Sequence, residues 1–138
     1  MIKYGKTSLE NIATLDPVMQ RICHRAIAIM NRRKLSRPDF GISSGRRTAP
    51  EQNAKWQQGR TTPGAIITHA DGYIVESAHQ SGFAVDFFAY IDGRADYDAG
   101  SLALIAMCFA TAANEYGKRW AWGGNFSTII DAGHFECY

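Results

Sequence analysis

The chain is organised around one apolar run, Phe83-Ala84-Val85-Asp86-Phe87-Phe88-Ala89, which has the pattern of a buried strand. A lone carboxylate in such a run is costly to bury unless a positive group neutralises it. The residues just before the run include His79, seven positions ahead of Asp86 and joined to it through Gly82. A metal ion would neutralise Asp86, and His134 near the end of the chain offers a third ligand. The stretch therefore predicts a metal site.

The composition bounds the class of protein. With 138 residues, 46% of them hydrophobic, the chain is long enough for one compact domain, 1–138, with a proper core. The net charge of +2 and the lack of like-charge runs argue against a nucleic-acid partner, although a weak positive bias suits an anionic polymer such as a bacterial cell wall. The three cysteines lack CxxC spacing and are expected to pack as buried thiols: Cys23, Cys108 and Cys137.

The start of the chain, Met1–Lys6, lacks the apolar core of a signal peptide, and no apolar run is long enough to span a bilayer. We therefore expect a product made in the cytoplasm that does not insert stably into membranes.

Four helix starts are predicted from capping residues. Ser8 is expected to cap a short first helix, and Asp16-Pro17 places a cap and a first-turn proline before the second. Thr48-Ala49-Pro50-Glu51 is a capping box, and Asp98 precedes the most apolar helix, which ends near Gly117.

Strands are expected between and after these helices, with Asp92-Gly93 as a hairpin turn. A long connection with two turn signals precedes the central strand and is expected to line a site. The predicted strands and this connection are Asp39–Ser43, Phe83–Ala89, Arg119–Trp122, Asp131–Cys137 and Arg60–Glu76. The order predicts a small α+β domain, with helices packed on a small, mainly antiparallel sheet. Because one candidate ligand lies on a loop and two lie on strands, we expect a zinc site at the sheet edge.

His79, Asp86 and His134 supply two imidazoles and one carboxylate, the number and type of ligands that zinc hydrolases use while water takes the fourth position. Asp131 lies three residues before His134, close enough to take a proton from a water that the metal acidifies. Glu136 points to the same strand face as His134 and is placed to accept its ring proton.

Other polar residues near these motifs, or on the helices and loops, have expected roles of their own. The pair Arg46-Arg47 before a helix start is either exposed charge or a guanidinium that holds an oxyanion, and Ser77 is expected to brace the loop backbone. His24 is expected on a solvated helix face, and His69 on a loop is left outside the site. The ligand pattern also has purely structural alternatives, because a histidine and an aspartate seven residues apart occur by chance in many proteins. His134 would then be a satisfied core histidine, and Asp131 and Glu136 ordinary strand-end charges.

Two ordered motifs carry a family resemblance: Ser77-x-His79-x-x-Gly82-x-Ala84-x-Asp86, and Asp131-x-x-His134-x-Glu136. In these motifs the chain resembles the zinc peptidase family of D-alanyl-D-alanine carboxypeptidases, and within it most closely the phage L-alanyl-D-glutamate endopeptidases, which are cell-wall lysins (endolysins). The resemblance runs in order from Ile42 to Glu136. Further matches are Ser44-Gly45-Arg46-Arg47-Thr48, Glu51-Gln52-Asn53-Ala54, Gln58-Gly59-Arg60-Thr61, Pro63-Gly64 and Trp122-Gly123-Gly124.

The resemblance implies zinc ligands at His79, Asp86 and His134, a catalytic acid/base at Asp131 and a transition-state arginine at Arg47. Arg46 ranks second, because it occupies a position that the family pattern leaves variable. Asn125 departs from the pattern, since these lysins often carry an acidic residue after the paired glycines. This departure concerns the charge on the substrate side and leaves the implied ligands intact.

The function implied is a zinc-dependent peptidoglycan hydrolase that cleaves the stem peptide between L-alanine and D-glutamate during bacteriophage host lysis. We further expect a monomer without a separate wall-binding domain, made in the host cytoplasm and acting on the wall after a separate pore-forming protein releases it. The alternatives are a D-alanyl-D-alanine carboxypeptidase and a non-catalytic, zinc-stabilised wall-binding module. Asp131 favours an enzyme, because a binding module needs no carboxylate beside an open metal position.

Overall fold

The computed structural model describes residues 1–33 and 38–138. Its elements, in chain order, are α1 (Lys6–Ala13), α2 (Pro17–Arg32), β1 (Asp39–Ser44), α3 (Ala49–Gln57), β2 (Ala84–Ile91), β3 (Arg94–Asp96), α4 (Ala99–Glu115), β4 (Trp120–Trp122), the 3₁₀ turn η1 (Gly123–Asn125) and β5 (His134–Cys137). The predicted class, a small α+β domain with helices on an antiparallel sheet, is confirmed.

Within the described residues the sheet has the order β1-β2-β5-β4, and β3 pairs with the far end of β2 through the hairpin turn at Asp92-Gly93. Each pairing is antiparallel. In this register Asp86 on β2 lies directly across from His134 on β5. The inner strands β2 and β5 thus bring together two residues that are 48 positions apart in the sequence.

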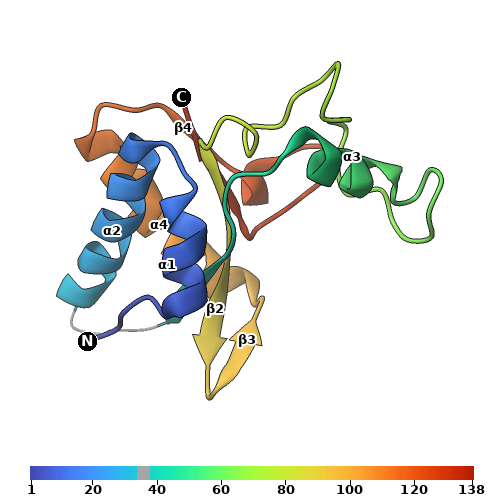
Figure 1. Ribbon diagram of the computed structural model, residues 1–138. Coiled ribbons are helices and arrows are strands. Elements are labelled where there is room, and N and C mark those ends of the chain that lie inside the picture. The colour runs from blue at the N-terminus through green and yellow to red at the C-terminus, as the bar shows by residue number, and fades with distance from the viewer. Residues whose placement is uncertain (34–37) are drawn as a thin grey trace.

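The core lies on one face of the sheet. Side chains on β2 alternate, so that Val85, Phe87 and Ala89 are buried while Asp86 faces the other way. Phe109 of α4 packs on the core face, with its ring centroid 5.4 Å from that of Phe87. Figure 1 shows α1, α2 and α4 gathered on one side of β2, and α3 with the connection that follows it on the other side. The face that carries Asp86 is therefore free of the main helical layer.

Three of the predicted helix starts are confirmed. The Asp16 and Asp98 carboxylates each accept a backbone N–H of the first turn, and Thr48 forms the predicted capping box with Glu51. The predicted cap at Ser8 is wrong. Helix α1 begins at Lys6, and Ser8 lies buried within it, where its hydroxyl accepts the Ile42 amide of β1 at 3.0 Å. A serine hydroxyl can accept a hydrogen bond from a strand amide as readily as from the first turn of a helix, so the local sequence does not separate the two roles.

The connection between α3 and β2 has no helix or strand, as predicted, apart from one isolated bridge between Gln58 and Thr62. One anchor within it is Asp71, whose carboxylate accepts the backbone N–H groups of residues 73, 74 and 75. The connection is thus held by polar contacts to backbone groups rather than by a sheet.

The three cysteines are buried free thiols, as expected: Cys23, Cys108 and Cys137. Burial raises the pKa of Cys23, which keeps that thiol protonated and unreactive. Among the helices of residues 1–33 and 38–138, none combines the length and apolarity needed to cross a membrane.

Candidate metal centre

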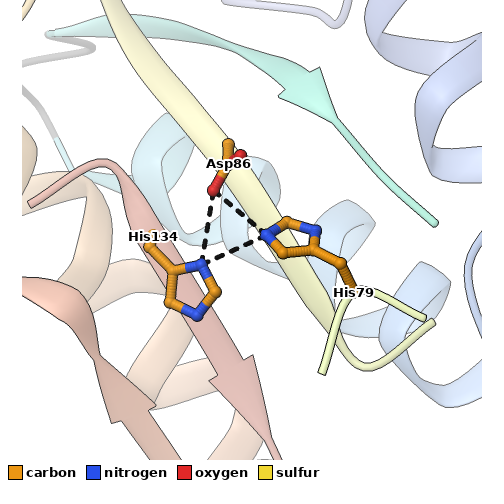
Figure 2. A group of neighbouring side chains, drawn as sticks. All are labelled: His79, Asp86 and His134. Carbon is orange, nitrogen blue, oxygen red and sulfur yellow. Dashed lines mark hydrogen bonds and ion pairs between the residues drawn. The ribbon is translucent and has the colours of Figure 1, made fainter. Parts of the chain in front are cut away.

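Three side chains converge on the face of the sheet opposite the helical core. Figure 2 shows His79 from the connection, Asp86 from β2 and His134 from β5 pointing at one another. His79 Nε2 lies 3.2 Å from Asp86 Oδ1 and 3.2 Å from His134 Nδ1. His134 Nδ1 lies 3.3 Å from the same Asp86 oxygen. The predicted ligand set is therefore assembled, and its three atoms could hold a metal ion.

The position of this cluster refines the predicted one. The expected place was the edge of the sheet, whereas Asp86 and His134 are cross-strand neighbours on the two inner strands. The alternation of side chains along β2 and β5 explains the placement, because it directs both residues to the face away from the helices.

Each histidine is oriented by an oxygen on its far side. His79 Nδ1 lies 2.9 Å from the Gly45 carbonyl oxygen, and His134 Nε2 lies 2.9 Å from Glu136 Oε1. A neutral imidazole that donates its outer N–H to such an oxygen turns an unprotonated nitrogen inward. Two inward lone pairs and a carboxylate oxygen cannot lie about 3 Å apart without a cation or a proton among them. The hydrogen-bond pattern thus suits a cation site.

The loop that carries His79 is braced as the sequence predicted. The Ser77 hydroxyl accepts the His79 backbone N–H at 3.3 Å. Gln80 accepts the Ser77 N–H through its side-chain oxygen at 2.9 Å and donates to the Gly72 carbonyl at 2.8 Å. The His79 carbonyl in turn accepts the Arg47 backbone N–H at 3.0 Å. These bonds fix the histidine although it stands on a loop.

The charges of the cluster are strongly coupled. Burial alone would raise the pKa of Asp86, but hydrogen bonds with His134 and His79 and the charge of Arg47 hold it well below its usual range. Burial would lower the pKa of His134, but its bonds to Asp86 and Glu136 outweigh burial and raise the pKa to about 9. Without a metal ion, a proton on His134 therefore balances the carboxylates at neutral pH.

The two arginines after Gly45 have different surroundings. Arg47 reaches the cluster, with Nη2 2.5 Å from Asp86 Oδ2, and its Nη1 donates to the Gln52 side-chain oxygen at 3.1 Å. Arg46 is exposed, and its Nε donates to the Thr14 carbonyl oxygen at 2.9 Å. The structure thus brings Arg47 to the site and leaves Arg46 outside it.

An open cavity of about 640 Å³ adjoins the cluster and holds a further titratable group. Asp131 lines it together with His79, Asp86 and His134. Partial burial of the Asp131 carboxyl and the negative charge of Asp86 raise its pKa.

The turn that carries Asp131 depends on a glycine. A Cβ at Gly123 would lie 2.0 Å from the Asp131 carbonyl oxygen, and the Gly123 carbonyl accepts the Asp131 N–H at 2.9 Å. This contact explains the glycine at position 123 of the Trp122-Gly123-Gly124 match.

Three residues of this region were not predicted from the sequence. Gln52 on α3 is fully buried and holds Arg47, while Lys55 and His69 line the cavity. His69 was expected outside the site; it lies on the cavity wall without belonging to the cluster of three. The signal for Gln52 was its place in Glu51-Gln52-Asn53-Ala54, one of the matches that carry the resemblance. Nothing in the sequence marked Lys55.

Fold and site together define a small α+β domain with a buried His/Asp/His cluster open to a cavity, as in metal-dependent hydrolases. The family model for the phage L-alanyl-D-glutamate peptidases matches residues 1–136. The chain belongs to this family, and the predicted resemblance is confirmed.

Individual relatives agree with this assignment. The L-alanyl-D-glutamate peptidase of Escherichia phage T5 is 28% identical over 149 residues, covering 97% of this chain and 96% of that protein. The crystal structure of the Serratia marcescens L-Ala D-Glu endopeptidase ChiX matches with a TM-score of 0.73 and 25% identity, over 99% of this chain and 90% of that chain. The vancomycin-resistance D,D-dipeptidase VanXYg, solved with a D-Ala-D-Ala phosphinate analogue, shares the fold. Its TM-score is 0.55 at 19% identity, over 89% of this chain and 50% of that chain.

Proposed function

We propose that this member of the family is a zinc-dependent endopeptidase that cleaves the L-alanyl-D-glutamate bond in the stem peptide of bacterial peptidoglycan. The observation that carries the proposal is the convergence of His79, Asp86 and His134 beside a cavity that Asp131 also lines. It is supported by relatives named for this bond, which align with almost the whole chain.

The spacing of the cluster supports zinc as the ion. Zinc–nitrogen bonds of 2.0–2.1 Å in a tetrahedral site place the ligand atoms about 3.3–3.4 Å from one another. The three ligand atoms here lie 3.2, 3.2 and 3.3 Å apart. Two imidazoles and one carboxylate are also a donor set that zinc accepts in hydrolases, and this set leaves room for water and substrate. His79, Asp86 and His134 would hold the ion.

When bound, zinc supplies Lewis acidity, which polarises the peptide carbonyl and makes water a stronger acid. The Asp131 carboxylate is placed to accept a proton from the attacking water and to return it to the leaving amine as the C–N bond breaks. The raised pKa of Asp131 suits its role as a base, because it makes the carboxylate a stronger proton acceptor than an ordinary aspartate. The products are a carboxylate and an amine.

Arg47 has two tasks in this proposal. Its guanidinium keeps Asp86 ionised, and its positive charge stabilises the negative oxygen that develops on the attacked carbonyl. Glu136 fixes the His134 ring, and Ser77 fixes the His79 backbone, so that both imidazoles keep their orientation.

The proposal is tested by product analysis of purified muropeptides with zinc quantified in the same sample. We expect release of free stem peptides that begin with D-glutamate, and loss of this activity with a chelator. Removal of single D-alanine residues instead would indicate a carboxypeptidase, and unchanged muropeptides with zinc-loaded protein would contradict an enzyme of this specificity.

A matched pair of variants separates chemistry from metal binding. Asp131→Asn is expected to retain zinc and the fold while activity falls by about 10²- to 10⁴-fold, the usual range for loss of general acid–base catalysis. His134→Ala is expected to lose zinc as well. Full activity of Asp131→Asn would remove Asp131 from its proposed role.

The proposed route to the substrate is release by a separate pore-forming protein, after which a monomer acts on the wall. Purified protein is then expected to lower the turbidity of Gram-negative cells whose outer membrane has been permeabilised, and not that of intact cells. Light scattering is expected to give a mass near 15.3 kDa. Lysis of intact cells, or a larger particle, would contradict these two parts of the proposal.

A further inference from the structure

The wall of the cavity carries more acidic than basic side chains. Its carboxylates are Glu76, Asp86, Asp131 and Glu136, and its strongly basic groups are Arg47 and Lys55. Apart from the proposed zinc ion, the cations on this wall that could receive a substrate carboxylate are therefore Arg47 and Lys55.

Arg47 is committed to the cluster, where it holds Asp86 and, in the proposed mechanism, stabilises the oxygen that becomes negative. Its Nη2 pairs with Asp86 at 2.5 Å, and Gln52 accepts from its Nη1 at 3.1 Å. Lys55, in contrast, makes no ion pair or side-chain hydrogen bond with any residue in 1–33 or 38–138, and its side chain is exposed on the cavity wall. Its charge is therefore available to a ligand in the cavity.

Helix geometry relates Lys55 to the cluster. Gln52 and Lys55 are three residues apart on α3 and share one face of the helix. Since each residue advances the helix by about 1.5 Å, Lys55 stands about 4.5 Å further along the axis than the residue that holds Arg47. Lys55 thus follows the residue that holds Arg47 by about one helical turn, and it lines the same cavity as the cluster.

The proposed scissile bond supplies a ligand for this ammonium. Glutamate has two carboxyl groups, and only one of them continues the peptide, so the residue after the scissile bond presents a free carboxylate. We propose that Lys55 binds this carboxylate and acts as a specificity-determining residue for D-glutamate. This inference rests on the proposed function and adds to it the residue that recognises the acidic side of the bond.

Two synthetic peptides test the assignment with the zinc-loaded protein. They differ only in the free carboxyl group of D-glutamate, which is a carboxylate in one and a primary amide in the other. An exposed ion pair contributes up to about 1 kcal/mol, so wild type is expected to prefer the carboxylate by about fivefold in kcat/KM, mainly through KM. The preference is expected to shrink at high ionic strength, because salt screens such a pair.

Variants of Lys55 are compared with a lysine elsewhere. Lys55→Met is expected to lower the preference about fivefold, Lys55→Arg to keep it, and Lys55→Glu to favour the amide peptide. Lys6→Met is the matched control, because Lys6 also stands on a helix but pairs with Glu10 and does not line the cavity. It changes the net charge equally and is expected to leave the preference unchanged.

The outcomes separate this inference from the proposed function. If wild type cleaves both peptides equally, or if Lys55→Met keeps the wild-type preference, the inference is overturned while the endopeptidase stands. If wild type cleaves neither peptide, the proposed function fails, and the assignment of Lys55 fails with it.

Discussion

A single residue, His134, is expected to set the pH dependence of metal binding. Its two ring nitrogens face Asp86 and Glu136, and these contacts raise its pKa to about 9 in the metal-free protein. Below that pH the ring holds two protons, yet a metal ligand must be neutral. Binding at neutral pH therefore displaces about one proton, and metal affinity is expected to rise about tenfold per pH unit up to about pH 9.

Calorimetric titration with zinc in two buffers of different ionisation enthalpy measures this proton directly. Glu136→Gln removes one of the two charges that favour the protonated ring, so its metal affinity is expected to depend less on pH. An affinity that is constant between pH 6 and pH 8 would contradict the expected proton release.

Single residues were predictable where their burial is energetically anomalous. Asp86 in an apolar run demanded a cation, and the pattern of His79 and His134 supplied partners that the structure brings within 3.3 Å of it. Gln52 carried no comparable anomaly, since an amide on a helix is usually solvated. Its burial depends on the approach of Arg47, a tertiary contact that no local pattern encodes.

At the scale of elements, Gln52 on helix α3 links Arg47 to the connection between α3 and β2. The fully buried side chain accepts from Arg47 and donates to the Thr68 hydroxyl at 3.3 Å and the Ala70 carbonyl at 3.0 Å. Gln52→Met removes these three hydrogen bonds to half-buried groups, which is expected to lower the free energy of unfolding by about 1–3 kcal/mol. We also expect a lower kcat with little change in KM, because Arg47 loses its support.

Denaturant unfolding, hydrogen exchange of residues 68–78 and steady-state kinetics measure these effects. Gln58→Met is the matched control, since Gln58 donates only an exposed bond to the Ala65 carbonyl in the same connection. If Gln52→Met shows the same hydrogen exchange in residues 68–78 and the same kcat as Gln58→Met, the proposed support of Arg47 by Gln52 is wrong.

Helix starts could be predicted where the residues at that position are found almost exclusively at helix ends. Asp16-Pro17 and the Thr48–Glu51 box start helices in the structure because their geometry suits a helix end and little else. The prediction at Ser8 was wrong because its hydroxyl serves the Ile42 amide instead of a cap. That contact joins α1 to β1 across 34 positions and is decided by packing rather than by local sequence.

At the scale of the whole molecule, the sheet separates the core from the site. The aromatic side chains of Phe87, Phe109 and Phe135 pack on one face, and the His/Asp/His cluster occupies the other. The alternation of apolar and polar residues along the strands predicted that the sheet has a core face and a polar face. It did not predict that β5 would insert between β2 and β4, because strand order depends on contacts made only after collapse. This insertion is what brings His134 across from Asp86.

Because the cluster joins the connection, β2 and β5, metal removal is expected to destabilise the whole domain. An ion present at a thousand times its dissociation constant stabilises the native state by about 4 kcal/mol. For a domain of this size each kcal/mol shifts the thermal midpoint by about 2–4 °C, so a chelator is expected to lower it by about 10 °C. Asp131→Asn keeps the three ligands, so calorimetry is expected to show the same zinc-dependent shift in this variant, whereas His134→Ala shows little. A midpoint that does not respond to chelator in wild type, while activity is lost, would mean that the ion serves the chemistry without holding these elements together.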